Sequence, residues 1–451
     1  MDIAGKNVLV FGSGISGIGA AGLLEERGAS VTLYDGNDKL DVEEIRGKMK
    51  DGAKTDIVLG EFPEELLGKL DLVIISPGVP TDLPIVNRMR ESDIPVVGEI
   101  ELAYNYDKGK VIAITGTNGK TTTTALVGEI MANYYDKVDV VGNIGNPYTT
   151  TAFDSTDDTV TVAEISSFQL ETIHTFKPDV SAVLNITPDH LNRHYTMECY
   201  TDVKMSIAKN QDSNQPIVLN YEDTILREYA GKLTNRIIWF SSKQKVNPLE
   251  GKNIIYADGK KETFVTTTED TTLVGIHNVE NIMAAIAISI NMDVPVDIIR
   301  ETIRKFKAVP HRIEYVETIN DVIYYNDSKG TNTDASIKAI EAMSRPTILI
   351  AGGYDKKVSF DDWAEAFGDK VKCLVLLGQT AEQIADTVKK HGFTNIIFTE
   401  SLKEAVDECA KNAKPGDAVL LSPACASWGM FDNYEQRGDM FKEYVRAMCE
   451  K

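Results

Sequence analysis

Short apolar runs alternate with helical patterns along most of the chain. The runs of the first two blocks are Asn7–Phe11, Ser30–Asp35, Leu70–Ser76, Lys110–Thr115, Val160–Ile165 and Val180–Ile186, and the first block ends near Gly98–Ala103. A third block begins around Val309–Arg312, and its runs are Thr347–Ala351, Cys373–Leu377, Asn395–Thr399 and Ala418–Ser422. Short β-rich runs separated by helical patterns indicate parallel strands joined by crossover helices, so we expect an α/β protein.

One stretch departs from this pattern. The segment from about Asp212 to Thr272 is more polar and β-prone, which favours an antiparallel subsheet or an excursion within the middle block. At 451 residues the chain is too long for one compact core. The pattern therefore predicts three domains, which we expect to span residues 1–106, 107–308 and 309–451.

Composition and charge exclude several classes of protein. The net charge of −21 argues against a nucleic-acid partner, because the phosphate backbone would be repelled. The five cysteines are scattered without a Cys-x-x-Cys pair, which fits a reducing cytosol better than a disulfide framework or a zinc site. The sequence has no recognisable signal peptide and no run of about 20 apolar residues. We therefore expect a cytoplasmic protein without nucleic-acid or membrane partners. We also expect a monomer whose ligands are small molecules, although the composition does not itself determine the oligomeric state.

A glycine motif follows the first predicted strand. Gly12-Ser13-Gly14-Ile15-Ser16-Gly17 has the pattern G-x-G-x-x-G between a strand and a helix, and Asp35 ends the next strand, where a ribose-binding carboxylate would lie. The glycines let the backbone approach an anion, and the helix N-terminus stabilises a pyrophosphate. The motif alone is compatible with NAD, with another nucleotide diphosphate, or with tight packing and no ligand.

A second glycine loop carries a stronger chemical signal. Thr115-Gly116-Thr117-Asn118-Gly119-Lys120-Thr121-Thr122 follows an apolar strand and opens a helix predicted over Thr122–Asn133. Backbone N–H groups of such a loop surround the β- and γ-phosphates, the lysine adds a point charge, and the threonine hydroxyl reaches Mg²⁺. The general pattern has glycine where this chain has Ile114, and its extra glycine is Gly116. We expect ATP to bind here.

From this loop onward the chain resembles the Mur ligase family, which builds the peptide stem of bacterial peptidoglycan. The matching stretches, in order, are Glu164–Leu170, Asn185–His190, Tyr200-x-x-x-Lys204, His277–Ala285, His311-Arg312, Asn326–Asn332, Ser422–Ser427 and Asn433–Gly438. The C-terminal stretches resemble the D-glutamate-adding members most closely. The resemblance covers essentially the whole chain, from Gly12 to Gly438.

The resemblance implies an ATP-dependent ligase that adds D-glutamate to UDP-N-acetylmuramoyl-L-alanine through an acyl phosphate, releasing ADP and phosphate. It implies a Rossmann-like N-terminal domain for the UDP part of the substrate, a central P-loop ATPase domain with a parallel sheet, and a Rossmann-like C-terminal domain for the amino acid. The N-terminal glycine motif then belongs to UDP rather than NAD. The UDP contacts implied are Gly14, Ile15, Ser16, Asp35 and Gly78.

The resemblance also assigns nucleotide and substrate residues. ATP is expected on Gly116, Thr117, Asn118, Gly119, Lys120, Thr121 and Thr122, with its adenine near Asn278 and Asn281, its ribose near Asp327 and its phosphates within reach of Arg312. Arg312 would act as an arginine finger supplied in cis. Asn143 and Ser166 are the candidates for orienting the muramoyl-alanyl arm. For D-glutamate, the residues implied are Thr331, Lys356 (or the adjacent Lys357), Ser427, Trp428 and Tyr434.

A metal site is expected beside the phosphate loop. Taken alone, His190 has the pattern of a loop histidine and Lys204, on a helical stretch over Cys199–Ala208, that of a solvated surface charge. The resemblance instead implies two Mg²⁺ ions held by Thr121, Glu164, His190 and an N-carbamylated Lys204. An ammonium beside Mg²⁺ has a lowered pKa, so the neutral amine can capture CO₂ and become an anionic ligand. The catalytic set expected is Lys120, Glu164, His190, Lys204 and Arg312.

Three other classes of function remain open from the sequence. An NAD-dependent oxidoreductase would explain Gly12–Gly17 but would leave Lys120 and Glu164 without a role. A related ligase that accepts another amino acid, or a folate-type substrate, would keep the chemistry and change the pocket. A nucleotide-sensing module would bind ATP without turnover.

Overall fold

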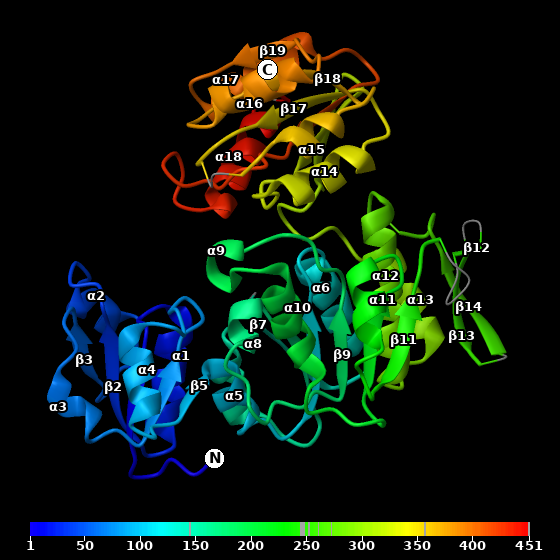
Figure 1. Cartoon of the computed structure of the whole chain (residues 1–451). Coiled ribbons are helices and arrows are strands. Elements are labelled where there is room, and N and C mark those ends of the chain that lie inside the picture. The colour runs from blue at the N-terminus through cyan, green and yellow to red at the C-terminus, as the bar shows by residue number, and fades with distance from the viewer. Residues whose placement is uncertain are drawn as a thin grey trace. The chain divides into compact units, whose positions relative to one another are not determined.

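The computed structural model describes residues 1–143, 146–243, 249–250, 253–259, 261–271, 273–355 and 358–449. Its contacts divide the chain into two compact units (Figure 1). The first unit comprises Met1–Thr267 and Asn281–Ile303, and the second comprises Thr268–Glu280 and Arg304–Lys451. Within these described ranges, we found no helix with the length and apolar character needed to cross a membrane.

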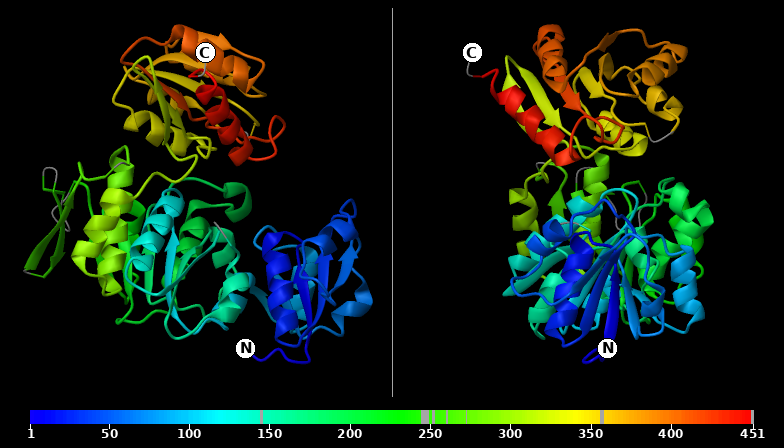
Figure 2. Two further views of the ribbon diagram at one scale, coloured as in Figure 1. Left: turned by 180° about the vertical axis from the view of Figure 1, so that it is seen from behind. Right: turned by 90° about the vertical axis from the view of Figure 1, so that its left-hand side faces the viewer.

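The first unit begins with a five-stranded parallel sheet. Its strands are β1 (Asn7–Phe11), β2 (Ser30–Asp35), β3 (Asp56–Leu59), β4 (Leu72–Ile75) and β5 (Val96–Gly98), in the order β3-β2-β1-β4-β5. The helices are α1 (Ile15–Glu26), α2 (Val42–Gly47), α3 (Glu64–Leu67), α4 (Pro84–Glu91) and α5 (Glu99–Tyr104). Helices cover both faces of the sheet (Figure 2), which is why β1 and β4 are apolar without alternation. The strand order reverses between β1 and β4, where ligands of such sheets bind.

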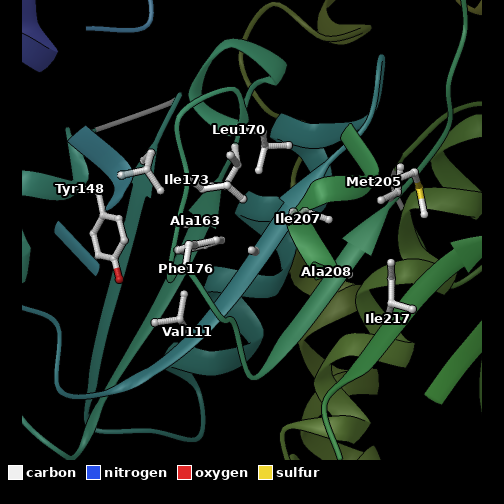
Figure 3. Close-up of a cluster of buried hydrophobic side chains, with 14 of the residues drawn as sticks. Val111, Tyr148, Ala163, Leu170, Ile173, Phe176, Met205, Ile207, Ala208 and Ile217 are labelled. Carbon is white, nitrogen blue, oxygen red and sulfur yellow. The ribbon is translucent and has the colours of Figure 1, made fainter. Parts of the chain in front are cut away.

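A six-stranded parallel sheet forms the second part of this unit. Its strands are β6 (Lys110–Thr115), β7 (Lys137–Gly142), β8 (Thr159–Glu164), β9 (Val180–Val183), β10 (Pro216–Asn220) and β11 (Arg236–Phe240), in the order β11-β10-β9-β6-β8-β7. The accompanying helices are α6 (Lys120–Ala132), α7 (Tyr148–Thr151), α8 (Ser167–Leu170), α9 (Leu191–His194), α10 (Met197–Met205), α11 (Thr224–Ala230), α12 (Ile276–Asn291) and α13 (Val296–Lys305). Figure 3 shows part of the core, in which Val111, Ala163 and Phe176 are buried together.

The predicted antiparallel subsheet is only partly right. The strands β12 (Leu249–Glu250), β13 (Asn253–Asp258) and β14 (Lys261–Thr267) do form an antiparallel sheet. Strands β10 and β11, however, lie in the same segment and extend the parallel sheet. Each residue of β10 is buried, and Ile217–Leu219 pair with Ser181–Val183 of β9. Burial on both faces made this strand part of the main core rather than of the subsheet.

The second unit contains a six-stranded sheet. Its strands are β15 (Glu314–Ile319), β16 (Val322–Asn326), β17 (Thr347–Ala351), β18 (Val371–Leu376), β19 (Ile396–Phe398) and β20 (Ala418–Leu421), in the order β15-β16-β20-β17-β18-β19. The helices are α14 (Thr333–Ala342), α15 (Asp361–Glu365), α16 (Ala381–Lys390), α17 (Leu402–Asn412) and α18 (Tyr434–Arg446). All pairs are parallel except the hairpin β15–β16. Alternate residues of β17 enter two separate cores, Leu349 with Trp363 and Ile350 with Phe441.

Candidate active site

The phosphate loop joins β6 to α6 in the first unit. Gly116 and Gly119 have φ values of 151° and 85°, which side chains rarely adopt. A Cβ atom on Gly119 would lie 2.3 Å from Oδ1 of Asn281. The close approach of α12 to this turn therefore requires glycine, and it brings the predicted nucleotide residue Asn281 to the loop.

Asn185, which follows β9, and Tyr200 of α10 contact the loop. Asn185 accepts a hydrogen bond from Asn118 N–H through Oδ1 (2.8 Å) and one from Thr117 N–H through its carbonyl oxygen (2.9 Å). The Thr117 hydroxyl lies 3.2 Å from the Tyr200 hydroxyl. Lys120 Nζ donates to the carbonyl oxygens of Gly116 (2.9 Å) and Thr117 (2.8 Å). The loop therefore has a fixed shape, with a lysine and the N-terminus of a thirteen-residue helix at one place, an arrangement that favours phosphate.

Three predicted catalytic side chains lie around this loop. Glu164 ends β8 and is buried, and its Oε1 accepts a hydrogen bond from Asn143 Nδ2 (2.7 Å). Its Oε2 is buried and has no hydrogen-bond partner within the described residues. Lys204 is buried on α10, and its Nζ donates to the Gly116 carbonyl oxygen (2.9 Å). His190 is exposed after β9 and has φ 53°, with its ring 4.9 Å from that of Phe168.

Burial makes the Lys204 amine unusual. Desolvation, together with repulsion from the nearby Lys120, lowers the pKa of Lys204 well below 10.5, although Asp189 and Glu164 oppose the shift. The lysine also lies over the Tyr200 ring, 4.8 Å from its centroid. Lys204 is therefore neither a surface charge nor an ordinary ammonium. Its burial could not be predicted from its position on a helical stretch of the sequence.

The donor set suits Mg²⁺ better than a transition metal. In the described part of the chain no group of three His, Cys, Asp or Glu side chains is arranged to hold a metal ion. Mg²⁺ needs no such cage, because it keeps several waters and shares phosphate oxygens of its substrate. The unpaired Glu164 oxygen and the hydroxyl of Thr121 at the start of α6 are oxygen donors, the kind of ligand that Mg²⁺ prefers.

The first sheet places the predicted UDP residues at its strand-order reversal. Asp35 Oδ2 accepts hydrogen bonds from Ser13 N–H (2.9 Å) and from the Ser13 hydroxyl (2.7 Å). A Cβ atom on Gly17 would lie 1.8 Å from the Gly12 carbonyl oxygen, so helix α1 packs closely against the loop. Gly14 is the N-cap of α1 and Ile15 is 77% exposed. Ser16 follows in α1, and Gly78 is exposed after β4.

The substrate-arm candidates lie at the end of β8. Asn143 binds Glu164 by its side chain, and its backbone N–H donates to the Glu164 carbonyl oxygen (2.8 Å). Ser166 caps α8 in a reciprocal pair of hydrogen bonds with Gln169. The structure thus brings Asn143, Glu164 and Ser166 to one edge of the sheet.

The second unit contains the remaining nucleotide candidates. Asp327 is buried, and it accepts hydrogen bonds from the Ser422 hydroxyl (2.7 Å) and from Ile313 N–H (3.3 Å). Burial raises the pKa of Asp327 to about 7, and the positive charge of Arg312 opposes the shift. Arg312 and Asp327 are therefore neighbours, while Asn278 donates its side-chain N–H to the Val274 carbonyl oxygen (2.7 Å).

The amino-acid candidates follow neighbouring strands of the second unit. Thr331 comes after β16, and Ser427 and Trp428 come after β20, the adjacent strand. Ser427 is buried, whereas Trp428 is 58% exposed with its ring 5.6 Å from that of Tyr354. Tyr434 begins α18, and its carbonyl oxygen accepts a hydrogen bond from the Ser328 hydroxyl (2.8 Å). The predicted Lys356 and Lys357 lie outside the described residues.

Two residues that interact with candidate site residues were not assigned from the sequence. Asn185 shapes the phosphate loop, and its signal was its place at the end of a strand beside that loop. Arg437 is buried on α18, where it donates to the Ser328 hydroxyl and the Cys425 carbonyl oxygen. Burial lowers the pKa of Arg437 to about 10. A charged residue among the apolar positions of α18 was the available signal.

Comparison with known proteins agrees with this geometry. Three family models match in order: the Mur ligase MurD-like N-terminal domain over residues 6–98, the Mur ligase middle domain over 114–289, and the Mur ligase glutamate ligase domain over 311–425. The predicted three-domain α/β fold class is thereby confirmed, while the boundaries at 106 and 308 stay predictions.

Curated relatives and solved structures extend the comparison. The chain is 59% identical to a UDP-N-acetylmuramoylalanine--D-glutamate ligase of Lachnospira eligens, over 99% of this chain and 100% of the relative. It is 45% identical to a ligase of the same name from Clostridioides difficile, again over 99% and 100%. Two Thermotoga maritima structures share the fold, each with a TM-score of 0.62: the UDP-N-acetylmuramate-alanine ligase MurC (19% identity, 99% and 100% covered) and the MurF ligase in complex with ADP (18%, 99% and 96%). The chain belongs to the Mur ligase family.

Proposed function

We propose that this enzyme uses ATP to join D-glutamate to UDP-N-acetylmuramoyl-L-alanine, a step in peptidoglycan synthesis. The observation that carries the proposal is the phosphate loop, whose shape is fixed by Asn185 and Asn281 and which lies beside the buried Glu164 and Lys204. The full-length similarity to D-glutamate ligases supports the substrate pair.

The reaction has two steps that balance in atoms and charge. A carboxylate oxygen of the alanyl substrate attacks the γ-phosphorus, the bond to the bridging oxygen breaks, and ADP leaves. The amine of D-glutamate then attacks the acyl carbon, phosphate leaves, and the amine loses a proton as the amide forms. Two Mg²⁺ ions would neutralise the charge of the transferring group. Thr121, Glu164, His190 and Lys204 are the residues that would hold them.

Each residue set has a defined task in this reaction. Backbone N–H groups of 116–122 and the Lys120 amine bind the nucleotide phosphates, and Arg312 adds a positive charge that stabilises the transition state. Asn143 and Ser166 orient the alanyl carboxylate. UDP is bound by Gly14, Ile15, Ser16, Asp35 and Gly78. The nucleoside of ATP is bound by Asn278, Asn281 and Asp327. D-glutamate is bound by Thr331, Lys356, Ser427, Trp428 and Tyr434.

Lys204 is proposed to be carbamylated in the active enzyme. Its lowered pKa leaves a neutral amine that can add CO₂ and release a proton, and the anionic carbamate would be a metal ligand beside Lys120. Activity should fall when CO₂ and bicarbonate are removed and return on their addition. An enzyme that is equally active without CO₂, and unmodified in native mass spectra, would contradict this part of the proposal.

The decisive experiment measures phosphate release with four mixtures: complete, without ATP, without UDP-N-acetylmuramoyl-L-alanine, and without D-glutamate. Only the complete mixture should release phosphate and form the amide product. A panel of D- and L-amino acids then tests the acceptor. If another amino acid or a folate-type acid is preferred, the substrate assignment is wrong; if ATP is bound but never consumed, the assignment as an enzyme is wrong.

The cellular location and the oligomeric state are also proposed. The scattered cysteines, which include no Cys-x-x-Cys pair, support a cytoplasmic enzyme. We propose that it acts as a monomer, which light scattering after size-exclusion chromatography would test.

A further inference from the structure

The turn that follows His190 is tied to a loop of the first sheet. Loop 79–82 follows Gly78 after β4, whereas α9 follows β9 of the second sheet. A terminal nitrogen of Arg193 donates to the Val79 carbonyl oxygen (2.9 Å), and the Tyr195 hydroxyl donates to Asp82 Oδ2 (2.5 Å). We call Val79, Thr81, Asp82, Glu171, Arg193 and Tyr195 the Arg193 cluster.

Glu171 is the centre of the Arg193 cluster. Its two carboxylate oxygens accept from Arg193, at 3.2 Å from Nε and 2.6 Å from a terminal nitrogen. The Thr81 hydroxyl donates to the same carboxylate (3.3 Å). The Arg193 and Glu171 side chains are only 13% and 10% exposed. A bidentate pair shielded from water holds its partners at a fixed distance and angle, which a surface pair does not.

His194 and Tyr200 connect Glu171 to the phosphate loop. His194, the neighbour of Arg193, lies 3.5 Å from Glu171 and 2.9 Å from the Ser167 hydroxyl. Its ring is 5.1 Å from that of Tyr200, whose hydroxyl contacts Thr117 in the loop. A continuous series of contacts therefore runs from loop 79–82 to the phosphate loop.

The backbone of the turn also depends on these contacts. His190 and Tyr195, at its two ends, have φ values of 53° and 65°, a region unfavourable for residues with a Cβ atom. Such conformations persist only where surrounding contacts hold them. Arg193 lies between the two residues and provides contacts of this kind, with its guanidinium 5.0 Å from the centre of the Phe168 ring. Phe168 in turn packs on His190.

We propose that Arg193 and Glu171 are positioning residues. They hold loop 79–82, which follows the proposed UDP contact Gly78, and also His190 at fixed distances from the phosphate loop. The inference rests on the proposed function, because it assumes that Gly78 borders the UDP site. Neither residue needs to touch substrate. Their role is to place the alanyl carboxylate within bonding distance of the γ-phosphate.

The role predicts a particular kinetic signature. Arg193→Lys keeps the charge but loses the bidentate geometry, and a small displacement at a reacting centre lowers the rate by roughly tenfold to a hundredfold. We expect kcat to fall by that factor, and KM for the UDP substrate to rise several-fold. The KM for ATP should stay within about twofold of wild type, since the phosphate loop keeps its contacts with Asn185 and Asn281.

The test compares Arg193→Lys, Glu171→Gln and the charge-reversed double variant Glu171→Arg/Arg193→Glu in the full-length enzyme. Arg88 and Glu64 provide a matched control, because they also form a bidentate pair but lie exposed on the first sheet's helices. Arg88→Lys and Glu64→Gln should leave all kinetic constants unchanged. Partial recovery of kcat in the double variant over the single variants would support a pairwise geometric role.

Failure of this inference can be told from failure of the proposed function. If wild type forms no product, the proposed function is wrong. If wild type is active and Arg193→Lys matches it in kcat and in every KM, the positioning role is wrong. Should the Arg193 variants fail to fold, Thr81→Val and Tyr195→Phe each remove one hydrogen bond without burying a charge. Loss of thermal stability in those two variants without a change in kcat or in KM for the UDP substrate would also overturn the inference.

Discussion

At position 119 we expect activity to depend on the backbone conformation and on the lack of a side chain. We expect Gly119→Ala to abolish ATP-dependent activity, because its Cβ would meet Asn281 at 2.3 Å and φ is 85°. The positive φ alone should cost about 1 kcal/mol of folding free energy. Gly22→Ala is a matched control, since nothing lies within 4 Å of its Cβ in α1, and alanine in a helix should add about 1 kcal/mol. Urea denaturation and ATP titration measure both effects; an active Gly119→Ala enzyme would contradict the close approach.

Glu99 should give the stability of the enzyme a pH dependence near neutrality. Burial raises the pKa of Glu99 from 4.5 to about 7, while hydrogen bonds from Gln169 Nε2 and from nearby backbone N–H groups oppose the shift. Its neutral form therefore stabilises the fold fully below pH 4.5, and this contribution is lost as the pH rises through 7. The shift corresponds to at most about 3 kcal/mol.

The variant Glu99→Gln tests this, since it cannot ionise. Its stability relative to wild type should increase as the pH rises through that interval and then level off. Unfolding in urea at a series of pH values measures the difference. The exposed Glu198→Gln should show no such trend, and a flat difference for Glu99→Gln would show that this carboxyl does not titrate there.

The sequence predicted the chemistry of individual residues better than their surroundings. The glycines of the phosphate loop were identifiable because the local backbone geometry requires them, and Lys120 was identifiable because it follows Gly119 in a phosphate-binding pattern. The burial of Lys204 was not, since it arises from residues far away in the chain, such as Gly116. The burial of Glu99 could not be predicted for the same reason, because its hydrogen-bond partner Gln169 is on α8, a helix of the second sheet.

At the scale of elements, the Glu101 carboxylate connects helix α5 by hydrogen bonds to the segment between β8 and β9. Glu101 accepts hydrogen bonds from the backbone N–H groups of His174 (2.8 Å), Thr175 (2.7 Å) and Phe176 (3.1 Å). Desolvation would raise the pKa of Glu101, but these bonds and that of the Thr175 hydroxyl outweigh it and the pKa is lowered. The contribution is thus present above the unfolded pKa and is lost as the pH falls through the folded value.

We expect Glu101→Gln to destabilise the enzyme by about 2 kcal/mol at neutral pH, because one carboxylate oxygen is replaced by an N–H that faces other donors. The deficit should shrink in acid, where wild type is protonated too. Equilibrium unfolding near pH 7 and near pH 4 measures both values. Glu65→Gln, at an exposed position, is the control, and a deficit that grows in acid would reverse the assigned sign.

Several strands were predicted with their exact bounds, whereas the missed strands include the edge strands β7 and β15 and the fully buried β10. The predicted bounds of β1, β2, β6 and β17 agree with the structure, and β1, β6 and β17 are each buried almost throughout. Strand β7 at the sheet edge alternates Lys137, Val138 and Asp139, a half-exposed pattern without a continuous apolar signal. The antiparallel β15 was missed because it too is partly exposed and pairs locally with β16.

For the whole molecule, nucleotide binding should be measurable as stability. A ligand that binds only the folded state at about 100 times its Kd adds about 2.7 kcal/mol. Mg²⁺ with a non-hydrolysable ATP analogue should therefore raise the Tm of wild type. Lys120→Ala should lose most of that rise, whereas Lys110→Ala, at the exposed start of the same strand β6, should keep it.

Comparing Lys120→Ala with Lys110→Ala also separates the effect of net charge from the effect of an amine located at the phosphate loop. The chain carries a net charge of −21, so both variants make it equally more negative and repel an anionic nucleotide alike at long range. Only Lys120 lies where its amine contacts the Gly116 and Thr117 carbonyl oxygens of the loop. Equal loss in the two variants would mean that net charge governs nucleotide binding, and equal retention would mean that the triphosphate binds elsewhere. Selective loss of the nucleotide-dependent rise in Tm in Lys120→Ala is the result that this loop's geometry requires.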